Sequence, residues 1–253
     1  MFGIDLSDKR ALVTGGSRGV GRAIARMLGE AGAAVGISYL NRREEADAVV
    51  ADLKRAGGRA WAHGGDLSVP AVSEALLEQA RAEFGTLDIF VGNAGIWKPA
   101  YVPISQMSDT QWRNTIGANL DSIFFTLRAA IPLLNEGGRI VLISSTAGQR
   151  GESGHGDYAA TKGAIISLVK GLAIELADRR ITVNAVAPGW IDTEMSLEPY
   201  KEGGRARIEA NIPLKRVARA DEVAGPVLFL CSPLADYITG EILNVNGGLV
   251  LCG

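Results

Sequence analysis

Short apolar runs alternate along the chain with longer segments in which apolar residues recur at helical spacing. Runs such as Ile140–Ile143 are apolar at every position, which is typical of a strand covered on both faces of a sheet. The pattern predicts strands at Ala11–Thr14, Ala34–Tyr39, Arg59–His63, Leu87–Gly92, Arg139–Ser144, Ile181–Ala187 and Ile242–Val245. It predicts helices at Gly21–Ala31, Arg43–Ala56, Ala71–Phe84, Asp109–Leu134, Tyr158–Ala177 and Ala220–Cys231.

Strands that alternate with helices predict a parallel sheet with helices on both faces. We therefore expect an α/β fold, a doubly wound, Rossmann-like parallel sheet of about seven strands. The chain has 253 residues, of which 47% are apolar, and this is enough for one sizeable core. Residues 1–253 are therefore predicted to form a single domain. In such folds ligands bind beyond the carboxyl ends of the strands.

Composition argues against several classes of function. The formal net charge is −2, from 26 basic and 28 acidic residues, so no broad basic surface is expected for nucleic acid. No stretch approaches the roughly 20 apolar residues of a membrane span, and Met1–Arg10 lacks the apolar core of a secretory signal. Cys231 and Cys252 lack metal-binding spacing, and no metal site is predicted. We expect a cytoplasmic protein that contacts neither membrane nor nucleic acid.

A glycine-rich segment joins the first predicted strand to the first predicted helix. It runs Thr14-Gly15-Gly16-Ser17-Arg18-Gly19-Val20-Gly21. Glycines let backbone amides approach a pyrophosphate closely, and a helix start adds unpaired N–H donors. The spacing is G-x-x-x-G-x-G and differs from the common G-x-G-x-x-G fingerprint. Taken alone, such a turn also fits a tight strand-to-helix connection that binds nothing.

Further motifs follow in an order that resembles the short-chain dehydrogenase/reductase family. The resemblance extends from about Leu12 to Gly248 and includes Asn93-Ala94-Gly95 after the fourth strand and Ser145 after the fifth. One departure is Gly92, where the family usually has asparagine, and we expect it to affect local hydrogen bonding rather than the chemistry. The resemblance implies a dinucleotide cofactor held by Gly15, Ser17, Arg18, Gly19, Val20, Gly21, Asn41, Arg42, Asp66, Leu67, Asn93, Ala94, Gly95, Tyr158, Lys162, Pro188, Gly189, Ile191 and Thr193.

The residues after the second predicted strand bear on which nicotinamide cofactor is bound. Folds that prefer NAD often have an acidic residue there, which accepts hydrogen bonds from the ribose hydroxyls. This chain has no carboxylate until Glu44, whereas Arg18 and Arg42 could both face a 2′-phosphate. The alternative is that both are solvated surface arginines. We predict NADP(H) in preference to NAD(H).

Four residues form the predicted catalytic set. Tyr158 and Lys162 are four residues apart on a predicted helix and so share a face. A free tyrosine titrates near pH 10, and a neighbouring ammonium is expected to lower that pKa. The resemblance implies that Tyr158 is the acid/base, that Lys162 also holds the nicotinamide ribose, that Ser145 binds the substrate oxygen and that Asn119 positions a water. Considered singly, each could be an ordinary surface or capping residue. The two histidines, His63 and His155, are given no role.

The substrate is the least determined feature. A lid is predicted at about residues 189–213, with Trp97 and Tyr101 as further apolar walls, although these aromatics could equally pack the loops. The chain most resembles 3-oxoacyl-(acyl-carrier-protein) reductases, notably at Gly240–Gly248. This implies a carbonyl reductase acting on a small carbonyl or alcohol compound or a carrier-bound acyl chain, and assembled as a homotetramer. A sugar or secondary-alcohol dehydrogenase and a non-catalytic dinucleotide-binding sensor are the alternatives.

Overall fold

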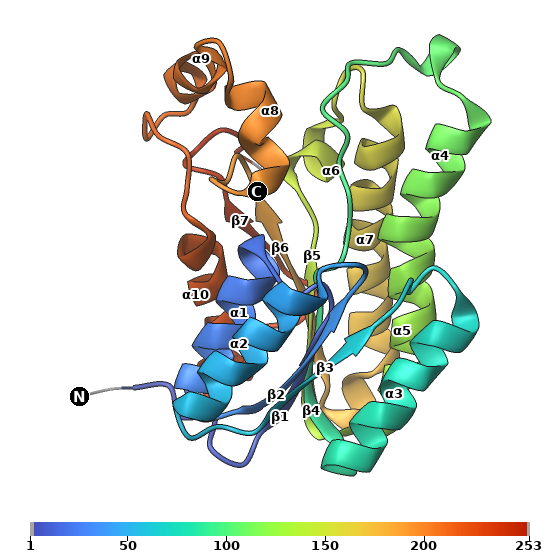
Figure 1. The fold of residues 1–253 in the computed structure, drawn as a ribbon, viewed down its shortest axis with the longest axis vertical. Helices are drawn as coiled ribbons and strands as arrows, with labels where there is room; N and C mark the ends of the chain where they lie inside the picture. The colour runs from blue at the N-terminus through green and yellow to red at the C-terminus, as the bar shows by residue number, and fades with distance from the viewer. Residues whose placement is uncertain (1–2, 252–253) are drawn as a thin grey trace.

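The computed structural model describes residues 3–251, and one seven-stranded sheet runs through them (Figure 1). Its strand order is β3-β2-β1-β4-β5-β6-β7, and every pairing is parallel. The predicted doubly wound parallel sheet is therefore confirmed. The strands are β1 (Arg10–Val13), β2 (Ala34–Tyr39), β3 (Ala60–Gly64), β4 (Leu87–Gly92), β5 (Leu134–Ile143), β6 (Thr182–Pro188) and β7 (Ile242–Val245).

Helices cover both faces of the sheet, as Figure 1 shows. One face carries α1 (Gly19–Glu30), α2 (Arg43–Arg55) and α10 (Ala220–Leu230). The other carries α3 (Pro70–Phe84), α4 (Asp109–Ile116), α5 (Ser122–Ala130) and α7 (Gly156–Glu175). Shorter helices are α6 (Thr146–Arg150), α8 (Leu197–Tyr200) and α9 (Gly204–Asn211). No helix within residues 3–251 combines the length and apolar character that a membrane crossing requires.

Alternation along the central strands explains why their sequence is mostly apolar. In β1, Ala11 and Val13 pack toward α1, whereas Leu12 packs toward α3 on the opposite face. In β4, Ile89 faces the first core and Phe90 the second. Successive side chains of a strand point to opposite faces, and both faces are covered here, so most positions are apolar. The buried polar residues Asp88 and Asn184 are hydrogen-bonded.

The predicted helix at Asp109–Leu134 is the main correction to the expected elements. It is interrupted by a π-turn at Gly117–Asp121, and a 3-10 turn follows at Ile131–Leu133. Pro132 cannot donate the backbone hydrogen bond that a continuing helix needs, so the helix ends there. Leu134 instead pairs with Leu87 at the start of β5, five residues before the predicted strand begins at Arg139.

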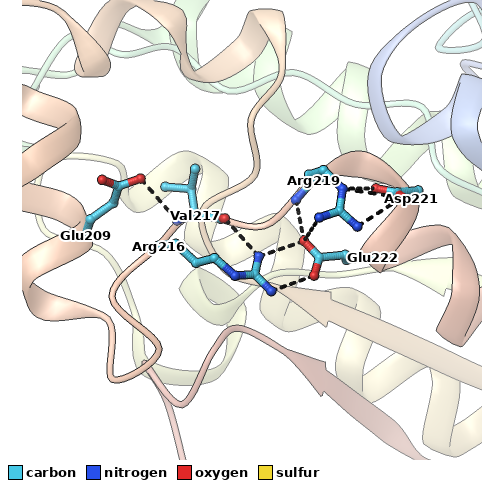
Figure 2. Close-up of polar contacts among 6 residues, drawn as sticks. All are labelled: Glu209, Arg216, Val217, Arg219, Asp221 and Glu222. Atoms are coloured by element: carbon cyan, nitrogen blue, oxygen red, sulfur yellow. Dashed lines mark hydrogen bonds and ion pairs between the residues drawn. The ribbon is translucent and has the colours of Figure 1, made fainter.

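The predicted lid region contains its own short helices and is tied to α10 at its end. After β6 the chain forms a 3-10 turn at Glu194–Ser196, followed by α8 and α9. Figure 2 shows the contacts that fix the return to α10. Arg216 donates to both carboxylate oxygens of Glu222 at 2.7 and 2.6 Å, and the Arg219 amide donates to Glu222 at 2.9 Å. These contacts fix the chain between α9 and α10, at the end of the lid region.

Candidate active site

The glycine-rich turn between β1 and α1 is closed by contacts to a neighbouring strand. Gly15 N donates to Ser38 Oγ at 3.1 Å, and Gly16 N donates to the Ser38 carbonyl at 2.9 Å. Gly15 has a φ of +67°, which glycine adopts without strain. A Cβ at Gly21 would lie 2.2 Å from the Gly15 carbonyl oxygen, so only glycine fits there. Because α1 begins at Gly19, its free N–H groups lie at the turn.

Asn93 joins this turn to the end of β4. Its Nδ2 donates to the carbonyls of Thr14 at 3.0 Å and Gly15 at 3.2 Å. The backbone amides of Asn93 and Ala94 both donate to Thr14 Oγ1 at 3.0 Å. At Gly92 a Cβ would lie 2.7 Å from the Leu142 side chain, so the family's asparagine would not fit without repacking. The unusual glycine is therefore accommodated, and the turn remains bonded to β4.

A cavity of about 510 Å³ lies along the carboxyl ends of the strands, within the size range of small-molecule sites. Its lining includes every residue predicted to contact the cofactor: Gly15, Ser17, Arg18, Gly19, Val20, Gly21, Asn41, Arg42, Asp66, Leu67, Asn93, Ala94, Gly95, Tyr158, Lys162, Pro188, Gly189, Ile191 and Thr193. Ser145 also lines the cavity. No motif singled out Ser38, Ile96, Glu194 or Met195, which line it too. The roles of these residues as cofactor contacts stay predictions.

Two arginines of the cavity converge on one lid carboxylate. Arg18 Nη1 pairs with Glu194 Oε2, and Arg42 Nη2 lies 3.9 Å from the same oxygen. Arg42 Nη1 also pairs with Glu45 at 3.0 Å. Two guanidinium groups at one edge of a cavity can bind a phosphate dianion. Glu194 could not be predicted from the motifs, because only the folding of the lid brings it to the glycine turn.

The predicted catalytic side chains meet where β5 ends beside α7. Tyr158 and Lys162 share one face of α7, and Lys162 Nζ lies 5.7 Å from the centre of the Tyr158 ring. The Lys162 amine also donates to the Ile143 carbonyl at 2.7 Å. Ser145, the second residue after β5, caps α6 by accepting from Ala147 N at 3.1 Å. The Ser145 hydroxyl acts on Tyr158, whose pKa it lowers, and both residues line the cavity.

The protonation of this pair differs from the expectation. Burial raises the pKa of Tyr158 to about 12, although the Ser145 hydrogen bond lowers it, and the Glu152 charge raises it further. Burial lowers the pKa of Lys162 to about 8. The expected lowering of the Tyr158 pKa is therefore wrong for the chain alone, because loss of solvation of the phenolate is the largest effect on it. At neutral pH the Tyr158 phenol therefore keeps its proton.

Asn119 lies behind the cavity rather than in its lining. It is fully buried in the π-turn between α4 and α5. Its Oδ1 accepts from Ile96 N at 2.7 Å, and its Nδ2 donates to the Ile96 carbonyl at 2.9 Å and to Thr161 Oγ1 at 3.2 Å. Thr161 lies between Tyr158 and Lys162 in α7. Asn119 thus connects the end of β4 to the helix of the catalytic pair, and π-turns are frequent at such sites.

The site offers no cluster of metal ligands. Within residues 3–251 no group of three His, Cys, Asp or Glu side chains is placed to hold a metal ion. Cys231 is buried, and burial raises the pKa of its thiol to about 12. Cys252 lies outside the described residues.

Known proteins share this fold and these sequence features. A family model described as enoyl-(acyl carrier protein) reductase matches residues 15–250. The 3-oxoacyl-(acyl-carrier-protein) reductase of Escherichia coli (strain K12) is 42% identical over 250 residues, which is 98% of this chain and 100% of that protein. The chain belongs to the short-chain dehydrogenase/reductase family. The resemblance stated from the motifs is therefore confirmed.

Solved structures of short-chain dehydrogenase/reductase proteins superpose closely. A structure titled short-chain dehydrogenase/reductase SDR:glucose/ribitol dehydrogenase, from Brucella melitensis, has a TM-score of 0.93 and 36% identity, and the match covers 99% of this chain and 100% of that one. A blue fluorescent protein from a metagenomic library, solved in complex with NADPH, has a TM-score of 0.92 and 36% identity, over 98% and 100% of the two chains. This chain is therefore an oxidoreductase of the short-chain dehydrogenase/reductase family, and both solved structures share its fold.

Proposed function

We propose that this chain is an NADP-dependent oxidoreductase that reduces a carbonyl group to an alcohol, with a 3-oxoacyl thioester or a similar ketone or aldehyde as substrate. One observation carries the proposal: Ser145, Tyr158 and Lys162 line the same cavity as the glycine-rich turn. A carbonyl substrate has an oxygen that can accept a hydrogen bond from both hydroxyls. The Escherichia coli relative is named for a 3-oxoacyl substrate, which supports the carbonyl class.

The residues of the cavity fit a nicotinamide dinucleotide. The glycine-rich turn lines the cavity, and the α1 N-terminus would hold the pyrophosphate. Arg18 and Arg42 would pair with the 2′-phosphate that distinguishes NADP from NAD. Ile191 and Thr193 would hold the nicotinamide carboxamide, as the family resemblance implies. The NADPH complex of the blue fluorescent protein supports this choice of cofactor. When bound, the nicotinamide supplies a hydride to the carbonyl carbon.

Tyr158 is the proposed proton donor. Its hydroxyl and that of Ser145 would both donate to the carbonyl oxygen and so hold it in place. With a pKa of about 12 the phenol carries its proton at neutral pH and can transfer it as negative charge develops on the oxygen. Lys162, fixed by the Ile143 carbonyl, places positive charge beside the phenol as it loses that proton. We assign to Asn119 the role of positioning a water that would link Lys162 to solvent.

The same side chains could run the reaction in reverse, as in a sugar or secondary-alcohol dehydrogenase. We assign reduction as the main direction, because the Escherichia coli relative is named a reductase. A sensor that binds a dinucleotide without turnover would have no need for Ser145, Tyr158 and Lys162 in one cavity.

NADPH consumption, followed by its absorbance, tests the proposal with acetoacetyl-CoA, a panel of small ketones and a panel of sugars. The expected result is NADPH-dependent reduction of at least one carbonyl compound, at a rate well above that with NADH. NADPH binding without consumption on any carbonyl would favour the sensor. Faster oxidation of a sugar or alcohol with NADP than any reduction would favour the dehydrogenase.

We also propose that the chain forms a homotetramer in the cytoplasm, as the family resemblance implies. Light scattering of the purified protein measures the oligomeric state directly. A mass that corresponds to four chains is the expected result.

A further inference from the structure

The carboxylate of Glu194 occupies the position between the two arginines of the cavity. Its Oε2 pairs with Arg18 Nη1 and lies 3.9 Å from Arg42 Nη2, so a single oxygen lies against both guanidinium groups. Arg42 also pairs with Glu45 at 3.0 Å. The two positive and two negative charges of these four residues cancel. A phosphate dianion that met this cluster intact would therefore find no net positive charge to attract it.

Glu194 can leave this position by rotation of its side chain. That side chain lines the cavity and is 53% exposed, so water can solvate the carboxylate once it is released. The backbone on either side is held in place: Asp192 N donates to the Ala218 carbonyl at 2.8 Å, and Ser196 N donates to the Thr193 carbonyl at 3.0 Å. An exposed ion pair is weak. The carboxylate can thus be displaced while the backbone of the lid stays where it is.

We propose that Glu194 is an internal competitor of the cofactor's 2′-phosphate and so limits how strongly the protein selects NADP(H) over NAD(H). This inference rests on the proposed cofactor. The 2′-phosphate and the Glu194 carboxylate need the same guanidinium donors, and two anions held side by side repel each other. NAD(H) has no 2′-phosphate and would leave the pair of Glu194 with Arg18 intact. Displacement of Glu194 therefore costs affinity for NADP(H) and none for NAD(H).

Glu194→Gln tests the inference, because glutamine keeps the length of the side chain and removes its negative charge. Isothermal titration calorimetry with NADPH and with NADH, without any substrate, measures the Kd of each cofactor for the parent and the variant. NADPH is expected to bind the variant about two- to five-fold more tightly, which is the range set by the loss of an exposed ion pair. The Kd of NADH is expected to stay the same within the error of the titration.

Glu198→Gln is the matched control. Glu198 lies in the same lid and is similarly exposed, but it pairs with Lys201 rather than with an arginine of the cavity. Its substitution removes the same charge and should leave both Kd values unchanged. The double variant Arg18→Ala/Glu194→Gln shows whether Glu194 acts through Arg18. The gain in NADPH affinity from Glu194→Gln should be smaller when Arg18 is absent, because the two side chains are in contact.

Three results would overturn the inference. Weaker or unchanged NADPH binding by Glu194→Gln would do so, and weaker binding would mean that Glu194 orients Arg18 for the phosphate instead. An equal gain for NADPH and NADH would show that the carboxylate acts on a part that both cofactors share. A gain of the same size without Arg18 would show that the two residues do not act together.

The titrations are independent of turnover, so failure of this inference leaves carbonyl reduction intact. That reaction is tested by NADPH consumption in the parent enzyme. Binding of neither cofactor to the parent would instead remove the proposed function, and the competition with it.

Discussion

Replacing Asn119 with alanine should destabilise the protein strongly. The side chain is fully buried and makes three hydrogen bonds, two of them to the backbone of Ile96. Alanine would leave the Ile96 N–H and C=O without partners, and each buried group left unpaired costs about 1–3 kcal/mol. The expected decrease in the free energy of unfolding is therefore about 2–6 kcal/mol.

Equilibrium unfolding in urea, followed by tryptophan fluorescence at one protein concentration, measures this decrease. Asn211→Ala is the matched control, because Asn211 is exposed and bonds only the Arg207 carbonyl of its own helix, at 2.9 Å. Its effect should stay within about 0.5 kcal/mol. A loss of less than about 1 kcal/mol in Asn119→Ala would refute the reasoning, because the Ile96 backbone would then have found other partners.

Asn119→Asp separates hydrogen bonding from packing. The aspartate keeps an acceptor for the Ile96 N–H and nearly the same volume, but it places an oxygen opposite the Ile96 carbonyl. The Thr161 hydroxyl cannot donate to this second oxygen, because it already donates to the Tyr158 carbonyl at 2.7 Å. The loss of stability should equal or exceed that of alanine at neutral pH. A nearly neutral effect would show that volume, rather than hydrogen bonding, matters at this position.

Three further predictions follow from other contacts. A Cβ in Gly148→Ala would lie 2.4 Å from the Lys162 carbonyl carbon, so overpacking of α6 on α7 should cost about 1–3 kcal/mol in urea unfolding. Arg18→Ala should weaken NADPH binding about ten-fold in fluorescence titrations and leave NADH binding nearly unchanged. Contacts to Arg216 and Arg219 lower the pKa of Glu222 from 4.5 to about 2, so its stabilisation is complete above pH 4.5 and is lost as the pH falls toward 2. Thermal unfolding of Glu222→Gln should therefore show a weaker pH dependence in this window.

Each of these has an outcome that would contradict it. An unchanged unfolding curve for Gly148→Ala would mean that α6 moves away from α7 freely. Equal losses of NADPH and NADH affinity in Arg18→Ala would place Arg18 away from the 2′-phosphate. Parallel pH profiles for the parent and Glu222→Gln would show that the network of Figure 2 carries no acid-sensitive stability.

The sheet could be predicted from the sequence because its strands are buried on both faces. Runs such as Ile140–Ile143 have no polar position, and this distinguishes them from the flanking helices. The spacing of the glycine-rich turn and of Tyr158 and Lys162 predicted which side chains gather at one cavity, since the carboxyl ends of parallel strands share one edge.

Other features depend on packing that hydrophobic spacing does not reveal. The π-turn at Asn119 changes the backbone register without changing the apolar pattern. Glu194 reaches Arg18 only through the folded lid, and Glu152 reaches His155 only through the turn before α7. The direction of the Tyr158 pKa shift was predicted wrongly, because it depends on burial. The spacing of residues along one helix does not show burial.

Turnover and NADPH binding by Tyr158→Phe, measured side by side, test the assignment of the proton donor most directly. The variant keeps the ring and its packing and removes only the hydroxyl. NADPH binding within a few-fold of the parent, together with a loss of turnover of about 10²–10⁴-fold, is the predicted result. Turnover within about ten-fold of the parent, with NADPH still bound, would contradict it and remove Tyr158 from the chemistry.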